Sequence, residues 1–193
     1  MPKLIIIEGP DNTGKNTIIN EILEKSEISK VIHCGKPKKS DDVLNEQYIT
    51  FSNFATIAII DYLGNSEDSI IFNRYHIGEY VYGQLYRGEE SEKILEMINK
   101  VEKQILSKIP QDDIYYVQLL STSSKLLQKN DDNKSLSNAK LELIEKEQEL
   151  FKIAFEKSIF KNKHIIYINK ENSDEFRNRE DIISEFNEFI KIK

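Results

Sequence analysis

The sequence is short of several residue types, and each shortage narrows what the protein can be. It has 193 residues, no tryptophan and a single cysteine, Cys34. One cysteine cannot form an internal disulfide, which is typical of proteins from a reducing compartment. No apolar run approaches the roughly 20 residues of a membrane span, and the first strand signal, at Leu4, leaves no room for a signal peptide. We therefore expect a cytoplasmic protein without membrane partners.

Positive charge is also scarce. Lysine and arginine together number 27 against 33 aspartates and glutamates, so the formal net charge is −6 at neutral pH. This balance gives no overall positive field, and we expect no nucleic-acid partner. The length and the hydrophobic content of 39% are sufficient for one domain with its own core. We therefore treat residues 1–193 as a single domain.

The strongest signal lies near the N-terminus, where an apolar run meets a glycine-containing loop. Residues 4–7 predict a strand buried on both faces, and the apolar residues after the loop recur at helical spacing. The loop reads G-P-D-N-T-G-K, the pattern of a phosphate-binding P-loop. Gly9 and Gly14 permit the backbone angles that turn N–H groups inward, and Lys15 supplies an ammonium for the phosphates. The alternative is a plain glycine turn between a strand and a helix.

We expect this loop to bind ATP. The residues predicted to do so are Gly9, Asn12, Thr13, Gly14, Lys15, Asn16 and Thr17. The residue after the lysine is usually a serine or threonine whose hydroxyl ligates Mg²⁺, but here it is Asn16. An amide oxygen is a possible but neutral ligand for this ion. Asn16 is therefore our first candidate for the metal.

Short apolar runs alternate with amphipathic stretches along the rest of the chain. Further strands are expected at about residues 31–34, 69–72, 114–119 and 165–168, and helices at about 42–63, 91–107, 136–157 and 179–192. This alternation predicts a three-layer α/β fold with a five-stranded parallel sheet, whose ligands bind at the carboxyl ends of the strands. The polar stretch at about 121–140 follows the fourth strand, and we interpret it as a small, mobile lid.

Two motifs resemble those of a known family. Residues 8–17, E-G-P-D-N-T-G-K-N-T, resemble the thymidylate kinase form of the loop, E-G-x-D-x-x-G-K-[ST]-T. Residues 73–75, N-R-Y, followed by Tyr82, resemble that family's D-R-Y segment with its downstream tyrosine. The longer run from Arg74 to Gly88 is similar to thymidylate-kinase-like proteins of bacteriophages. The resemblance implies a P-loop kinase fold and a homodimer. It also implies location in the host cytoplasm if the protein is viral.

The resemblance also implies a reaction and the residues that perform it. The reaction is transfer of the ATP γ-phosphate to a deoxynucleoside monophosphate. By position, Asp11 would hold the sugar 3′-hydroxyl of the acceptor, and Arg74 would bind its phosphate. Tyr82 would pack against the sugar and discourage a 2′-hydroxyl. The aromatic region around Phe51 would stack on the base.

Several of these residues have a structural interpretation as well. A guanidinium just past a buried strand suits bidentate phosphate binding, and the alternative for Arg74 is a structural ion pair with Glu8 or Glu79. Glu79, in the same segment, is a candidate substrate ligand. Phe51 is either a base-stacking ring or a core residue. Lys36 follows the second strand and is our candidate for a further contact to the acceptor phosphate.

Three departures from the family pattern concern the residues that would bind Mg²⁺ or neutralise the charge of the phosphates. Besides Asn16, the family's aspartate before the arginine is Asn73, so a carboxylate that steadies Mg²⁺ is missing. Glu8, at the end of the neighbouring strand, is the candidate that replaces it, and Asn73 itself remains a candidate residue of the metal site. The loop and the lid also contain no arginine, and we name Lys125 as the candidate catalytic cation of the lid. An arginine finger is worth about 10³ to 10⁵ in rate for related chemistry.

These observations lead to three functional hypotheses. The first is an ATP- and Mg²⁺-dependent nucleoside monophosphate kinase, whose lid closes to exclude water. The second is a nucleotide-binding protein that has lost transfer chemistry, which the two asparagines and the arginine-free lid favour. The third is a nucleotide phosphohydrolase. A dependence of ATP consumption on an added acceptor separates the first from the others.

Overall fold

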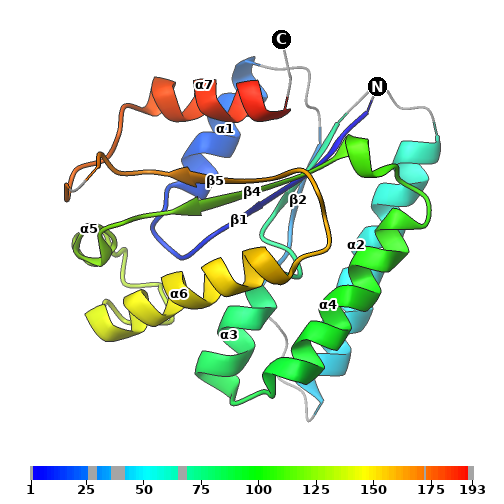
Figure 1. The fold of residues 1–193 in the computed structure, drawn as a ribbon, viewed down its shortest axis with the longest axis horizontal. Helices are drawn as coiled ribbons and strands as arrows, with labels where there is room; N and C mark the ends of the chain where they lie inside the picture. The colour runs from blue at the N-terminus through cyan, green and yellow to red at the C-terminus, as the bar shows by residue number, and fades with distance from the viewer. Residues whose placement is uncertain (1, 26–29, 36–41, 65–68, 172, 191–193) are drawn as a thin grey trace.

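A computed structural model describes residues 2–25, 30–35, 42–64, 69–171 and 173–190. Five parallel strands form one sheet, and helices cover both of its faces (Figure 1). The strands, in the spatial order β2-β3-β1-β4-β5, are β2 (Lys30–His33), β3 (Ile70–Asn73), β1 (Leu4–Glu8), β4 (Ile114–Leu120) and β5 (Lys163–Tyr167). This three-layer α/β arrangement around a five-stranded parallel sheet confirms the predicted fold class.

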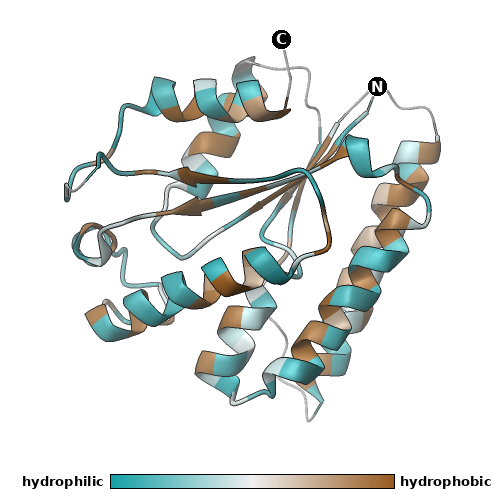
Figure 2. Cartoon of the chain, viewed as in Figure 1, coloured by the Kyte–Doolittle hydropathy of each residue, from teal (hydrophilic) through white to brown (hydrophobic). Residues whose placement is uncertain are grey.

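The central strand β1 explains why the first apolar run has no polar alternation. Leu4 and Ile6 pack into the core on one face of the sheet, whereas Ile5 and Ile7 pack into the core on the other. All four side chains are buried, as expected for a parallel strand with helices on both sides. The strands are accordingly the most hydrophobic part of the ribbon in Figure 2.

The helices divide into two layers. One face of the sheet carries α1 (Lys15–Lys25) and α7 (Arg179–Ile190), and the other carries α2 (Val43–Leu63), α3 (Gly78–Arg87), α4 (Ser91–Leu106) and α6 (Leu141–Lys157). The short helix α5 (Ser124–Lys129) and a 3₁₀ turn (Gln111–Asp113) flank β4. Within the described residues, no helix is both long enough and apolar enough to cross a membrane.

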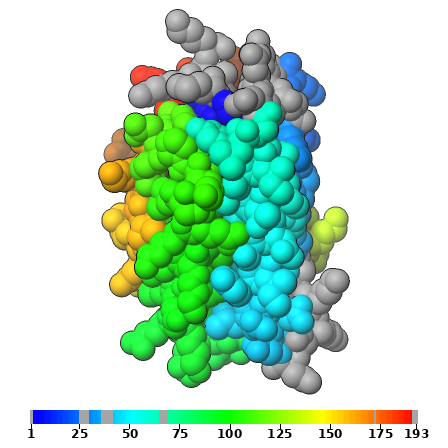
Figure 3. All heavy atoms as spheres, turned by 90° about the vertical axis from the view of Figure 1, so that its right-hand side faces the viewer, coloured from blue at the N-terminus to red at the C-terminus, as the bar shows by residue number. Residues whose placement is uncertain are grey.

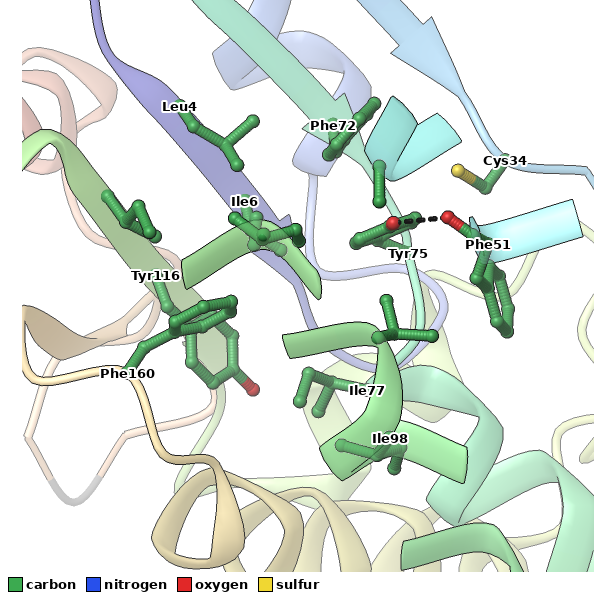
Figure 4. Close-up of a cluster of buried hydrophobic side chains, with 14 of the residues drawn as sticks. Leu4, Ile6, Cys34, Phe51, Phe72, Tyr75, Ile77, Ile98, Tyr116 and Phe160 are labelled. Carbon is green, nitrogen blue, oxygen red and sulfur yellow. Dashed lines mark hydrogen bonds between the residues drawn. The ribbon is translucent and has the colours of Figure 1, made fainter. Parts of the chain in front are cut away.

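An aromatic cluster joins α2 to the end of β3 (Figure 4). The rings of Phe72 and Tyr75 stack with centroids 4.4 Å apart, and Phe51 meets Tyr75 edge to face at 5.4 Å. The Tyr75 hydroxyl donates a hydrogen bond of 2.5 Å to the carbonyl oxygen of Phe51. The ring contact and the hydrogen bond between Tyr75 and Phe51 together fix the position of α2 beside the segment that follows β3.

Most predicted elements are present, with shifted ends. The strand predicted at 31–34 spans Lys30–His33, and the strand predicted at 165–168 spans Lys163–Tyr167. The helix predicted from residue 136 begins at Leu141, because Asn138 and Ala139 have positive φ angles of 49° and 56° that a right-handed helix excludes. Helix α3 occupies a stretch to which the sequence pattern assigns no element, and the lid contains α5.

Candidate functional site

A cavity of about 540 Å³ opens at the carboxyl edge of the sheet, between the P-loop, α2, α3 and the lid. Most of the site residues predicted from the sequence line it: Glu8, Asp11, Asn12, Gly14, Lys15, Asn16, Thr17, Phe51, Arg74, Glu79 and Tyr82. Gly9, Thr13 and Asn73 support it from behind through contacts given below. Lys36 lies outside the described residues.

The P-loop depends on a close backbone approach at Gly9. Its φ is 142°, and a Cβ at this position would lie 2.2 Å from the carbonyl oxygen of Leu119 in β4. Only glycine fits there, so the loop turns tightly against the neighbouring strand. Asn12 and Gly14 also have positive φ angles, of 64° and 75°. The conformation therefore requires the glycines that the motif provides.

Lys15 lies inside the loop in this structure. Its ammonium donates to the carbonyl oxygens of Gly9, at 2.7 Å, and Pro10, and lies 3.2 Å from the Thr13 hydroxyl, which itself donates to the Pro10 carbonyl. Only 4% of Lys15 is exposed. Burial, together with the positive charge of Arg74, lowers the pKa of Lys15 to about 7, although Asp11 opposes the shift. An anion that enters the cavity would therefore stabilise the protonated form of Lys15.

Asn16 and Asn73 contact each other at the base of the loop. The Nδ2 group of Asn73 donates to Oδ1 of Asn16 at 2.7 Å and lies 2.9 Å from Nδ1 of His33. The Oδ1 atom of Asn73 is buried and has no hydrogen-bond partner among the described residues. Across the same residues, no group of three or more His, Cys, Asp or Glu side chains could hold a metal ion.

Glu8 has a fixed carboxylate. Its Oε1 accepts hydrogen bonds from the backbone N–H groups of Tyr75, at 2.7 Å, and Gly78, at 3.2 Å. These bonds attach the end of β1 to the segment that leads into α3. Burial raises the pKa of Glu8, while the two backbone hydrogen bonds and Lys15 oppose that shift. Glu8 thus holds the shape of the cavity wall, of which its side chain is a part.

Arg74 forms an ion pair with Asp11, not with Glu8 or Glu79. Its Nη2 lies 2.5 Å from Oδ1 of Asp11, across the mouth of the cavity. The backbone of Arg74 has a φ of 61°, which is unusual for a residue other than glycine and turns the chain sharply after β3. The two residues expected to bind the phosphate and the sugar of one acceptor are therefore paired with each other.

Tyr82 lies next to a pair formed by Tyr86, which is partly buried, and the buried Glu147. Its ring stacks on that of Tyr86 with centroids 6.1 Å apart, and its hydroxyl is buried without a hydrogen-bond partner in the described residues. The Tyr86 hydroxyl donates to Oε1 of Glu147 in α6 at 2.5 Å. Burial raises the pKa of Glu147 to about 7 despite this hydrogen bond. Tyr82 also lines the cavity, although its hydroxyl itself is buried.

A second polar cluster forms the wall opposite the P-loop. The carboxylate of Glu79 accepts from Nε2 of Gln47 at 3.2 Å and from Nη2 of Arg87. All three side chains line the cavity beside Phe51, which is 2% exposed. Phe51 is thus both a core residue and part of the cavity wall, so its two interpretations from sequence are compatible.

The lid contributes a different lysine from the one predicted. Lys125 is exposed on α5 and does not line the cavity, whereas Lys134 does, together with Asp132 and Leu136. The reason is that residues 124–129 form a helix that packs Leu126 and Leu127 into the core and directs Lys125 to the surface. Lys134 is therefore the lysine of the lid, residues 121–140, that lines the cavity.

Sequence reasoning did not identify Gln47, Arg87 or Lys134 as residues that line the cavity, nor Glu147 as the partner of Tyr86. A signal existed for Gln47, which is one helical turn before Phe51 and therefore shares its face. Arg87 pairs with Glu79 two turns earlier on the same helix, whereas Glu147 meets Tyr86 only through the packing of α3 against α6, which the sequence does not encode locally.

Comparison with known proteins supports the fold. The sequence matches no protein-family profile and no curated protein. The structure is similar to the crystal structure of the YorR protein from Bacillus subtilis in complex with phosphorylated GDP, with a TM-score of 0.65. The two chains are 15% identical, and the similarity covers 98% of this chain and 96% of YorR. At this identity the likeness establishes a shared fold.

Proposed function

We propose that this protein transfers the γ-phosphate of ATP to a deoxynucleoside monophosphate, as thymidylate-kinase-like enzymes do. The observation that carries the proposal is the position of Arg74, Asp11 and Tyr82 in the same cavity as the P-loop lysine, Lys15. A binding site for a triphosphate thus adjoins a second site with an arginine, a carboxylate and a tyrosine. A nucleotide hydrolase needs only the first of these sites.

On the donor side, Lys15 would exchange its loop carbonyl partners for the β- and γ-phosphates. Backbone N–H groups of the loop and the first turn of α1 would bind the same oxygens. Phosphoryl transfer needs positioning and charge neutralisation more than a general base. The low pKa of Lys15 without ligand fits this exchange, because its charge is poorly compensated by the carbonyl groups that now surround it.

On the acceptor side, Arg74 would exchange Asp11 for the phosphate of the monophosphate. A guanidinium can bind a phosphate, like a carboxylate, through two parallel hydrogen bonds, so the exchange requires little change in hydrogen-bond geometry. Release of Asp11 would leave its carboxylate free to accept a hydrogen bond from the sugar 3′-hydroxyl. Tyr82 would then pack against the sugar. One substrate would thereby reorganise both residues at once.

The asparagine pair fits a Mg²⁺ ion that arrives with the nucleotide. Mg²⁺ in such sites is bound by one or two protein groups, with substrate phosphates and waters completing its shell. Asn16, supported by Asn73 and its unpartnered buried oxygen, would hold the ion, and Glu8 would add negative charge on that side. When bound, Mg²⁺ would neutralise phosphate charge. Because both amide oxygens are neutral, we expect weak binding.

The lid would supply the remaining charge and exclude water. Lys134 is the lysine of the lid that lines the cavity, and a lysine acts as a point charge where an arginine would form a fork. Closing the lid over both substrates favours transfer to the acceptor over transfer to water. The YorR structure, whose bound ligand is phosphorylated GDP, supports a nucleotide ligand for this fold.

We also propose a cytoplasmic homodimer, in the host cytoplasm if the protein is viral. Helix α2 lies beside α4 on one face of the molecule (Figure 3). Its exposed large apolar side chains are Ile49, Ile57, Ile60 and Leu63. An apolar stripe on a long helix is suited to pairing with a second copy. Replacing Ile60 with glutamate should convert the dimer to a monomer in size-exclusion chromatography with light scattering; an unchanged mass would contradict this interface.

The test of the function is a coupled assay of ADP formation with and without an added deoxynucleoside monophosphate. We expect ADP to form only when an acceptor is present, and Arg74→Ala to raise the KM for the acceptor while leaving ATP affinity within about twofold. Equal ATP loss with and without acceptor would indicate hydrolysis. Tight ATP binding with no turnover would favour the binding protein, a candidate that the asparagines at positions 16 and 73 support.

A further inference from the structure

We propose that the acceptor carries guanine, and that Glu79 reads its base edge. This inference rests on the proposed function, because it assigns the base of the acceptor that Arg74 would bind. It is carried by the wall of Gln47, Glu79 and Arg87, a cluster that the phosphate chemistry described above does not use.

The wall has the right position for a base. Gln47 and Phe51 lie one turn apart on the buried side of α2, and both line the cavity. Glu79 lies in the first turn of α3, one turn before Tyr82, the residue proposed to face the sugar. A base linked to that sugar would therefore lie between the Phe51 ring and the side chain of Glu79. Flat aromatic surfaces and in-plane polar groups are what a nucleobase needs.

The Glu79 carboxylate has unused hydrogen-bonding capacity. Two carboxylate oxygens provide about four lone-pair sites, and the described contacts fill one from Gln47 and one from Arg87. Each oxygen therefore keeps one acceptor site. Glu79 is only 4% exposed, so these sites are sheltered from bulk water, and a ligand with matching donors would gain more than at the surface.

Arg87 adds a donor to the same wall. Arg87 lines the cavity, and Glu79 holds its Nη2, so the remaining N–H groups of the guanidinium are left for a ligand. Burial lowers the pKa of Arg87, but an arginine remains charged at any pH at which the protein is folded. The wall therefore presents a pair of acceptors next to a positively charged donor.

Guanine is the base whose edge matches this pattern. Its Watson–Crick edge carries two adjacent donors, N1–H and the 2-amino group, followed by the acceptor O6. A carboxylate takes the two donors side by side, and a guanidinium donates to the acceptor. Adenine, cytosine and thymine each place a lone pair next to their single donor, and that lone pair would face a carboxylate oxygen. The mismatch would leave buried polar groups unpaired.

The test compares acceptors that differ in one group. With the wild-type protein, kcat/KM should be at least about tenfold higher for dGMP than for dTMP, dAMP or dCMP. Deoxyinosine monophosphate, which lacks only the 2-amino group of dGMP, should lose about tenfold to a hundredfold. This comparison uses the unmodified protein, so it does not depend on a variant that folds.

Glu79→Gln makes the assignment specific to one side chain. The substitution keeps the shape but replaces one acceptor oxygen with an amide, so the ratio of kcat/KM between dGMP and deoxyinosine monophosphate should fall below about threefold. Glu92→Gln, which removes an exposed carboxylate of α4 outside the cavity, should leave that ratio unchanged. Equal use of all bases, a preference for dTMP, or an unchanged ratio in Glu79→Gln would overturn the base assignment alone. No turnover with any acceptor would overturn the proposed function and this inference with it.

Discussion

Binding of ATP should draw a proton onto Lys15. In the ligand-free structure the ammonium is buried among loop carbonyl groups, and its pKa is lowered to about 7. A triphosphate in the loop would replace these neutral partners with oxygens that carry several negative charges. An opposite charge within hydrogen-bonding distance favours the protonated form, so the pKa should return towards its ordinary value of about 10.4.

The size of the effect follows from these two pKa values. With a pKa near 7, about half of the Lys15 side chains are protonated at pH 7 and about a tenth at pH 8. If the bound form is fully protonated at both pH values, ATP binding takes up about 0.5 proton at pH 7 and about 0.9 proton at pH 8. The uptake should therefore increase with pH over this range, and affinity should fall as pH rises from 7 to 9.

Titration calorimetry in two buffers with different ionisation enthalpies measures this uptake directly. The difference between the two binding enthalpies, divided by the difference in ionisation enthalpy, gives the number of protons. At pH 8 the phosphates contribute little themselves, because the second pKa of a phosphate monoester is about 6. A Lys15→Met variant, measured at higher ATP concentration, is the control and should show no uptake. Identical enthalpies in both buffers for the wild-type protein would refute the reasoning.

Three further predictions concern other parts of the site. Gly9→Ala would place a Cβ 2.2 Å from a carbonyl oxygen of β4 and should lower the free energy of unfolding by roughly 3 kcal/mol or more, which corresponds to a melting temperature about 6–12 °C lower. The control is Gly35→Ala, which has open space around the added Cβ and should change the melting temperature little. Asn73→Asp restores a carboxylate beside Asn16 and should lower the Mg²⁺ concentration for half-maximal activity about tenfold; a higher requirement would contradict the metal assignment. Lys134→Met should reduce kcat about tenfold to a hundredfold, and Lys125→Met less than twofold, so the reverse order would return the role to the lysine on α5.

The sequence was sufficient to predict what depends on neighbours along the chain. Residues 4–7 are uniformly apolar because β1 has a core on both faces, and this pattern is readable without a structure. The glycines at positions 9 and 14 likewise indicate where the backbone adopts positive φ angles. With the strand and helix alternation, these signals determine the layer architecture and bring the predicted site to one edge of the sheet.

What the sequence could not predict depends on side chains far apart in the chain. The pairing of Arg74 with Asp11, and of Gln47 with Glu79, exists only once α2, α3 and the P-loop are packed around one cavity. The start of α6 was misplaced because Asn138 and Ala139 adopt left-handed angles without a glycine or proline to mark them. The position of the lid lysines could not be predicted for a related reason, since the direction of a side chain on α5 depends on which residues of that helix pack into the core. Lys134 lines the cavity and Lys125 does not, and the catalytic role of either lysine stays a prediction.

The fate of the labelled γ-phosphate of ATP tests the central claim most directly. The purified protein is incubated with γ-labelled ATP and a mixture of deoxynucleoside monophosphates, and the products are separated by chromatography. If the cavity joins a donor and an acceptor as proposed, the label appears in a deoxynucleoside diphosphate, and Lys15→Met abolishes this transfer. Label found only in inorganic phosphate, or left on ATP, would contradict the account.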